Sequence, residues 1–348
     1  MFNDTFIYVC IFSFMLYVLV LNLVPSVLRR FLIPLKNVQH IHTSLIPRLA
    51  GFVIFLSLTL FYFSTPINEL RHPLAVILIS AFPLWFAAFI EDIQGNVLHL
   101  HRLAGIFFSI CVFIFINDFS WPRLSFIGSD FLYKNPFLIK VIFALVIATV
   151  VNGVNFIDGV NGIACFSITV SFLCLFMLAQ RVDDMIFVHL SLLLLGLLSI
   201  FILFNFPFAK IFLGDSGAYL LGYLLITMLI IFYGRHPELS NWGAVVMVFY
   251  FAFEVIFSFF RKIIQKTSPL LPDDKHLHLL LFRKLCASYS KKMANPLTTI
   301  ILSIIYLQPL LYISLFPAEK FWMGLSLFLL SLTYIFSYFH FYKKAISN

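Results

Sequence analysis

Long apolar segments recur along the whole chain of 348 residues, and they restrict its fold more than any other feature of the sequence. Each segment has roughly 17–25 residues, the length that a helix needs to cross a hydrocarbon core of about 30 Å. Charged residues make up 11% of the chain, whereas soluble domains carry about 25%. We therefore predict an all-α, polytopic integral membrane protein whose helices form a bundle.

The apolar segments predict eleven membrane spans, at residues 5–24, 47–64, 73–90, 103–119, 137–154, 163–180, 185–204, 217–233, 242–260, 296–315 and 321–340. No long polar insertion separates them, so a single membrane domain over residues 1–348 is expected. The first span lacks a basic segment before it and a small-residue cleavage site after it, which favours a retained helix over a signal peptide.

Basic residues are unevenly divided between the two sides of this predicted bundle. The segments that follow the odd-numbered spans hold 16 of the 23 Lys and Arg residues, and the other side holds 7. Because cytoplasmic loops carry an excess of basic residues, we expect the first set to be cytoplasmic. The N-terminus then lies outside and the C-terminus in the cytoplasm. Topology and contacts with lipid headgroups account for the net charge of +8, so no nucleic-acid partner is inferred.

Four polar segments fall on the predicted cytoplasmic side, and each could contribute to chemistry. The first is the pair Glu91 and Asp92 at the end of a span. Adjacent carboxylates repel each other unless a cation or a proton offsets their charge. A surface turn is the alternative interpretation of this pair.

The second segment is NGVNFIDGVNG at residues 152–162. Its three glycines permit tight turns and a close approach of the backbone to a ligand. Asn155, Asp158 and Asn161 supply oxygens that suit Mg²⁺ and amides that could contact a nucleobase. Such residues are costly between two apolar helices, so their presence there favours a functional site.

The third and fourth segments complete the set. Asp215, in GDSG, is predicted at the start of a helix, where it could bind a metal or act as an N-cap. The basic segment 261–295 contains Pro272-Asp273-Asp274-Lys275-His276-Leu277-His278. Cationic groups and imidazole N–H groups bind phosphate oxygens. Together the four segments predict a Mg²⁺-dependent site for phosphates at the cytoplasmic boundary of the membrane.

The motifs HTSLIPRLAG, FIEDIQG, NGVNFIDGVNGIA, IFLGDSGAYLLG and PDDKHLHLLLFRK resemble those of the polyprenyl-phosphate N-acetylhexosamine-1-phosphate transferases, within glycosyltransferase family 4. The resemblance covers roughly residues 40–290. It implies ten or eleven helices with a cytoplasmic groove, in a bacterial inner membrane. It also implies transfer of a sugar-1-phosphate from a UDP-sugar to undecaprenyl phosphate, with release of UMP and with Mg²⁺, or alternatively Mn²⁺, as the cofactor.

The resemblance also implies a role for individual residues. It makes Asp215 and Asn155 the metal ligands, and it makes Asn161 the residue that contacts uracil. Asp92 matches an acid that acts on the lipid phosphate, and Asp158 is the acid of the NFIDG motif. The residues expected to contact substrate phosphates or to lie beside them are His276, His278, Arg283, Asp273, Arg48 and Lys210, and Glu91 joins Asp92 and Asp158 as a catalytic candidate.

The sequence departs from the family pattern in four places. Glu91–Asp92 replaces an Asp–Asp pair, and Asn161 replaces an aspartate that many bacterial members carry. The loop reads His-Leu-His-Leu, with one histidine fewer than the full motif, and Leu49-Ala50-Gly51 replaces a glycine pair. These departures favour an O-antigen or lipopolysaccharide branch over the peptidoglycan-precursor enzyme. N-acetylglucosamine is the default sugar; N-acetylated deoxy-aminosugars, the prenyl length and a homodimer stay open.

Other interpretations remain at this point. A transporter of a lipid or an anionic solute would also contain polar residues within its spans, and a CDP-alcohol phosphotransferase is a rival enzyme whose spaced Asp-rich signature is absent. Glu254 lies about 10 Å inside the ninth span by helix rise, and it is either a functional group or half of a structural pair. Asp183–Asp184, on the opposite side, is interpreted as a solvated turn.

Overall fold

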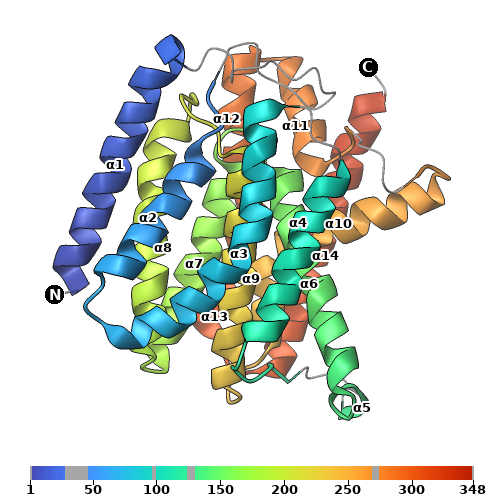
Figure 1. Ribbon diagram of the computed structural model, residues 1–348. Helices are drawn as coiled ribbons and strands as arrows, with labels where there is room; N and C mark the ends of the chain where they lie inside the picture. The colour runs from blue at the N-terminus through green and yellow to red at the C-terminus, as the bar shows by residue number, and fades with distance from the viewer. Residues whose placement is uncertain (1, 28–45, 96–98, 124–129, 269–273, 347–348) are drawn as a thin grey trace.

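The computed structural model describes residues 2–27, 46–95, 99–123, 130–268 and 274–346, and these residues form α-helices and no strand (Figure 1). In chain order the helices are α1 (Phe2–Val27), α2 (Ala50–Ser64), α3 (Asn68–Gln94), α4 (His99–Ile116), α5 (Asp130–Tyr133), α6 (Pro136–Ile157), α7 (Ile163–Arg181), α8 (Met185–Asn205), α9 (Gly214–Arg235), α10 (Trp242–Ile264), α11 (Leu277–Cys286), α12 (Lys291–Tyr306), α13 (Gln308–Leu315) and α14 (Lys320–Ile346). The prediction of an all-α bundle is confirmed.

The predicted spans agree with these helices. Nine helical segments of the described chain are long and apolar enough to cross a membrane, and α2 and α4 are shorter apolar helices. Together they account for all eleven predicted spans. The tenth span is divided into α12 and α13 at Leu307, because Pro309 in the first turn of α13 has no N–H to continue the helix. The chain is a multi-pass membrane protein.

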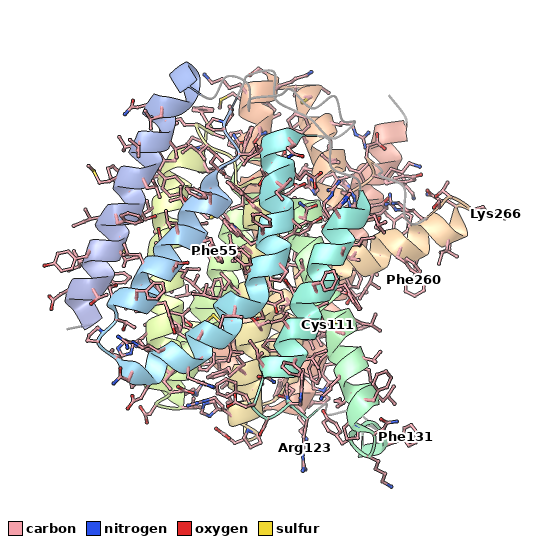
Figure 2. The ribbon with its side chains drawn as sticks, in the orientation of Figure 1. Phe55, Cys111, Arg123, Phe131, Phe260 and Lys266 are labelled. Carbon is pink, nitrogen blue, oxygen red and sulfur yellow. The ribbon has the colours of Figure 1, made fainter. Side chains whose placement is uncertain are left out.

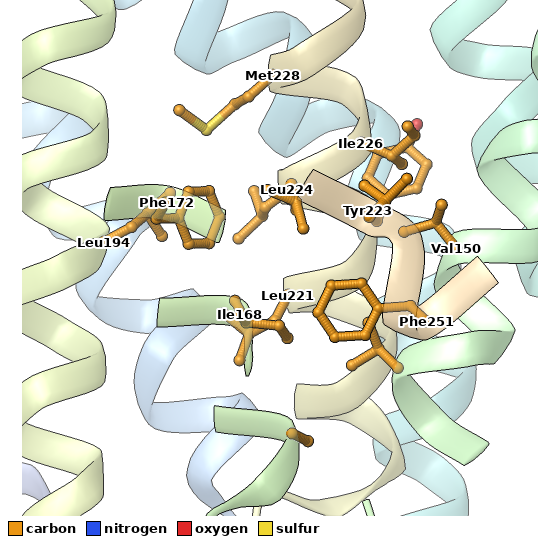
Figure 3. Close-up of a cluster of buried hydrophobic side chains, with 14 of the residues drawn as sticks. Val150, Ile168, Phe172, Leu194, Leu221, Tyr223, Leu224, Ile226, Met228 and Phe251 are labelled. Atoms are coloured by element: carbon orange, nitrogen blue, oxygen red, sulfur yellow. The ribbon is translucent and has the colours of Figure 1, made fainter. Parts of the chain in front are cut away.

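Helix α9 forms the centre of the bundle. Every residue from Ser216 to Tyr233 is buried, and the helix packs against α3, α6 and α2. Figure 3 shows Leu221 and Leu224 of α9 between side chains of α7 on one side and those of α6 and α10 on the other. A helix that is apolar on all sides and carries small residues can occupy such a position. The first turn of this central helix carries Asp215.

Gly51 is a point of close contact between α2 and α9. A Cβ atom at this position would collide with the backbone nitrogen of Gly217, so the two helices must separate to admit one. We expect Gly51→Ala to lower the free energy of unfolding by about 1–3 kcal/mol. Gly324→Ala is the matched control, because nothing lies within 4 Å of the added atom. Melting curves of both variants in detergent test this: an unchanged midpoint for Gly51→Ala would contradict the contact.

Asp184 corrects one expectation. Its side chain is buried instead of solvated, and it accepts hydrogen bonds from Arg235 Nε (3.0 Å) and from the backbone N of Phe187 (3.4 Å). It also lies 2.9 Å from His236 Nε2. The carboxylate caps α8 and joins the α7–α8 turn to the end of α9. The sequence offered no sign of this, because the two basic partners lie 51 and 52 positions later, at the end of α9. Asp183 is exposed, as predicted.

The polar segments lie near one end of the bundle. Figure 1 shows the C-terminal end of α3 at the same end as α11, α12 and the C-terminus of α14. The C-terminal part of α10 projects away from the other helices; Figure 2 labels Phe260 on it and Lys266 just beyond its end. Phe260 and Ile264 are exposed there, which fits a surface that faces lipid.

Candidate functional site

The first turn of α9 is built by contacts with two other segments. Gly214 begins the helix with φ of +75°, a conformation that glycine adopts without steric cost. The backbone before it pairs with the start of α2, where Phe212 N donates to Pro47 O at 2.9 Å and Gly51 N donates to Leu213 O at 3.2 Å. A Cβ at Gly214 would lie 2.6 Å from Asp92 Oδ2, so glycine also makes room for that carboxylate.

Asp92 caps this helix from α3. Its Oδ1 accepts from the backbone N of Asp215 and its Oδ2 from the backbone N of Ser216, both at 2.9 Å. The first N–H groups of a helix lack partners within the helix, and a carboxylate there also complements the helix dipole. Asp92 therefore fixes the turn that carries Asp215, a contact that the sequence did not predict. Its predicted role toward a lipid phosphate stays a prediction.

The Asp215 carboxylate is held by side chains from two further helices. Asn155 Nδ2 of α6 donates to Asp215 Oδ1 at 3.0 Å, and Arg102 Nη1 of α4 contacts Asp215 Oδ2 at 3.3 Å. Arg102 Nε also lies 2.8 Å from Glu91 Oε2. Arg102 thus supplies one cation for Glu91 and Asp215, whereas Asp92 is stabilised by the backbone N–H groups of α9. In the sequence alone Arg102 indicates only the topology, although its place at the start of the span after Glu91–Asp92 is a usable signal.

The donor set around Asp215 can be compared with what Mg²⁺ requires. The described residues contain no group of three His, Cys, Asp or Glu side chains that would hold a metal by itself. Mg²⁺ commonly binds one or two carboxylates together with substrate phosphates and water. The Asp215 side chain is 23% exposed, and Asn155 keeps its amide oxygen as a ligand while its nitrogen contacts Asp215. These residues fit an ion that is shared with a phosphorylated substrate.

The C-terminal end of α6 connects Asp215 to the basic segment 261–295. Asn155 contacts Asp215, whereas the ring of the next residue, Phe156, lies 5.3 Å from the ring of His276. Asp158 ends α6, and burial raises the pKa of its carboxyl well above the usual value. The nearby Asp215 carboxylate adds to this increase in pKa, and Arg48 opposes it. Asp158 and Asp215 therefore share one electrostatic environment.

Asn161 is fixed by α12 and by the segment before α9. Its backbone N donates to Asn295 Oδ1 (2.8 Å), its carbonyl accepts from Thr299 Oγ1 (2.7 Å), and its Nδ2 donates to Pro207 O (2.9 Å). The buried Oδ1 has no hydrogen-bond partner among the described residues. It could accept the N3–H of uracil, which fits the predicted role. Asn295 and Thr299 were not identified from the sequence, because they lie more than 130 positions away.

His276 and His278 lie at the start of α11 and are buried. Their rings are stacked at 5.9 Å, with 13° between the planes. A Cβ at Gly159 would collide with His278 Nε2, so the glycine admits this ring beside Asp158. Burial lowers the pKa of His278 to about 3. His278 is therefore a neutral imidazole near pH 7, which can donate a hydrogen bond to phosphate but carries no charge.

This environment of His278 predicts a pH-dependent stability. The unfolded chain binds a proton at the ordinary pKa of 6.5, whereas the folded chain does not, so stability falls as pH decreases from about 6.5 toward 3. We expect the melting temperature of the wild type, measured relative to that of His278→Gln, to drop between pH 7.5 and pH 5. The raised pKa of Asp158 has the opposite effect on stability, and it acts in both proteins. Equal decreases in the two proteins would show that His278 does not contribute to the effect.

The other predicted contact residues are distributed around this end of the bundle. Arg283 of α11 forms an ion pair with Asp274, which precedes that helix, and both side chains are about two-fifths exposed. Lys210 is exposed, and its backbone N donates to Phe204 O at 2.8 Å. The carbonyl of Arg48 faces Gly214. Asp273 lies outside the described residues.

Comparisons with known proteins agree with this geometry. The model of a family described as glycosyl transferase family 4 matches residues 74–233, which contain the polar segments around Asp92, Asn155 and Asp215. An undecaprenyl-phosphate alpha-N-acetylglucosaminyl 1-phosphate transferase of Thermotoga maritima is 28% identical over 246 residues, 70% of each chain. A probable undecaprenyl-phosphate N-acetylglucosaminyl 1-phosphate transferase of Bacillus subtilis is 22% identical over 278 residues, 76% of this chain and 75% of that one.

A third relative covers a shorter region at higher identity. The decaprenyl-phosphate N-acetylglucosaminephosphotransferase of Mycolicibacterium smegmatis is 31% identical over 150 residues, 37% of each chain. Taken with the motifs and the arrangement around Asp215, these similarities lead to one assignment. The similarities support the family of polyprenyl-phosphate N-acetylhexosamine-1-phosphate transferases, with the model of glycosyl transferase family 4 matching residues 74–233.

Proposed function

We propose that the protein transfers a sugar-1-phosphate from a UDP-sugar to a polyprenyl phosphate, with undecaprenyl phosphate as the default acceptor, and releases UMP. The observation that carries this proposal is the position of Asp215, which Asp92, Asn155 and Arg102 hold from three other helices. The names of the relatives support the acceptor and favour N-acetylglucosamine as the sugar. A transporter would not require this set of contacts around one partly exposed carboxylate.

In the proposed reaction an oxygen of the lipid phosphate forms a bond to the β-phosphorus of the UDP-sugar. The bond from that phosphorus to the bridging oxygen breaks, and UMP leaves with the electron pair. Both reactants already carry phosphates, so positioning and charge compensation should provide most of the catalysis. Mg²⁺, bound by Asp215 and Asn155, would supply neutralisation of phosphate charge.

The remaining residues act on the two substrates. Asn161 would accept from uracil through its buried Oδ1. His276 and His278 would donate to diphosphate oxygens, with Arg48, Lys210 and Arg283 as further contacts. We place the reaction at the cytoplasmic face of a bacterial inner membrane, because 16 of 23 basic residues fall on that side of the predicted topology. The lipid-linked product would begin a cell-envelope glycan such as an O-antigen.

The test is release of UMP by the purified protein in detergent, with Mg²⁺, undecaprenyl phosphate and a panel of UDP-sugars. The panel contains N-acetylglucosamine and N-acetylated deoxy-aminosugars such as quinovosamine and fucosamine. Release that requires lipid and metal, with one preferred donor, would establish the reaction and its sugar. Absence of release with every donor, from protein that melts cooperatively, would contradict the proposal and favour transport.

A further inference from the structure

Glu254 is a buried carboxylate that the proposed transfer does not use. It lies on α10 within a segment long enough to span the membrane, and it is 1% exposed. An ionisable group in such a position is costly unless other polar groups satisfy it. Its partners therefore indicate its role.

Both oxygens of Glu254 have partners, and these come from two other helical segments. Oε1 lies 2.9 Å from His276 Nδ1 and accepts weakly from Leu277 N at 3.4 Å. Oε2 accepts from the hydroxyl of Tyr334, on α14, at 2.6 Å. The carboxylate thus links α10 and α14 to the residue at which α11 begins.

The contact with Glu254 fixes the orientation of the His276 ring. A carboxylate at Nδ1 requires that this nitrogen carry the proton, which leaves Nε2 as the ring nitrogen for a ligand. The ring also packs against Phe156 and stacks on His278, so it has little freedom to rotate. Phe156 adjoins Asn155, which contacts Asp215. The orientation of this imidazole is therefore coupled to the segment that forms the site.

Tyr334 is itself held in place by aromatic contacts. Its ring lies edge-on to Phe253 at 4.9 Å and to Phe257 at 5.4 Å, on the same face of α10 as Glu254. Tyr334 is fully buried and lies on the last helix, far beyond residues 74–233 that the family model matches. The last helix thus supplies a contact to the site region that the family match does not include.

We infer that Glu254 and Tyr334 are positioning residues that orient His276 toward the diphosphate of the donor. The inference rests on the proposed function. A ring with a proton on each nitrogen can donate one N–H to a carboxylate and the other to a phosphate oxygen. Tyr334 holds Glu254 so that the carboxylate faces the ring. Neither residue touches the substrate; both act through His276.

The test compares Glu254→Gln, Tyr334→Phe, His276→Gln and the double variant Glu254→Gln/His276→Gln in the full-length protein. For each we would measure the melting temperature, the binding of UDP without lipid, and kcat and KM for the UDP-sugar. Glu254→Gln should weaken UDP binding and raise KM about tenfold or more, the range for hydrogen bonds to charged groups. UDP binding and KM of the double variant should be no worse than those of His276→Gln alone, because each single change already removes the same contact between Glu254 and His276.

Tyr250→Phe is the matched control for Tyr334→Phe. Tyr250 is also buried, lies one turn from Glu254 on α10, and its hydroxyl has no hydrogen-bond partner in the described part of the chain. Tyr334→Phe should weaken UDP binding several-fold, in the range of a single neutral hydrogen bond, and Tyr250→Phe should leave it unchanged. Equal effects of the two variants would show that a general packing change is responsible, which would overturn the inference.

Further outcomes separate this inference from the proposed function. If the losses of UDP binding in Glu254→Gln and His276→Gln multiply in the double variant, Glu254 acts independently of His276. If Glu254→Gln lowers the melting temperature but leaves kcat and KM unchanged, Glu254 has only a structural role. Either result overturns the inference. Normal UDP binding and turnover in His276→Gln would overturn it as well, while transfer by the wild type would still support the proposed function. Absence of turnover in the wild type contradicts the proposed function, whereas UDP binding still tests the inference.

Discussion

Replacement of Asp215 with asparagine is expected to lower turnover by at least about 10²–10³-fold, the cost of removing one preorganised electrostatic group from an active site. The carboxylate is the acid that Asn155 and Arg102 both contact, and it remains partly exposed. Asparagine keeps the shape and can still accept from Asn155. However, the amide nitrogen of asparagine faces Arg102 or the metal, and the negative charge of Asp215 is lost. Turnover should therefore fall while the protein stays folded.

The measurement is UMP release at saturating lipid, together with the increase in melting temperature that Mg²⁺ and UDP produce. The wild type should show this increase, and Asp215→Asn should show little or none. Asp118→Asn is the matched control, because Asp118 is exposed and pairs with His72 away from the site. If Asp215→Asn kept most of its turnover and its response to Mg²⁺, the assignment of Asp215 as the metal ligand would be wrong.

The membrane spans could be predicted because a helix in lipid needs a fixed length of apolar residues, and that requirement is local in sequence. Asp215 and Asn155 could be selected as candidates by a signal that is equally local, since polar residues are conspicuous where a span begins or ends; the structure brings the two together, and their metal role stays a prediction. The central position of α9 was not predicted. It depends on close approaches such as Gly51 to Gly217, and a glycine in sequence does not show which helix it faces.

The residues that the sequence analysis missed act through contacts that join distant parts of the chain. Tyr334 contacts Glu254 across 80 positions, and nothing distinguishes it from the other tyrosines of an aromatic helix. Arg102 resembles any basic residue at a membrane boundary, where topology is a sufficient explanation. Glu254 was recognised as unusual because it is charged within a span, but its partner could be identified only once α11 was placed against α10.

Asp92→Asn is expected to reduce both stability and turnover, because the carboxylate holds the helix turn that carries Asp215. Each oxygen accepts one backbone N–H at 2.9 Å. Asparagine has a single acceptor, so its NH₂ group must face one of these N–H donors. Loss of a cap costs about 0.5–2 kcal/mol. Turnover should fall by about 10²-fold, since a displacement of about 1 Å at a reacting centre can have that effect.

The resemblance to the family implies a different role, in which Asp92 acts on the lipid phosphate, and the two roles predict different results. If Asp92 acts only on the lipid, Asp92→Asn should lower kcat while the melting temperature and the binding of UDP remain unchanged. If Asp92 holds the first turn of α9, the melting temperature and the affinity for UDP should decrease together with kcat. Asp184→Asn is the matched control, because Asp184 caps α8 at a different turn and also has basic partners. Asp184→Asn should lower the melting temperature without changing turnover per folded molecule. Any loss of turnover in Asp92→Asn beyond that of Asp184→Asn therefore reports on the position of Asp215.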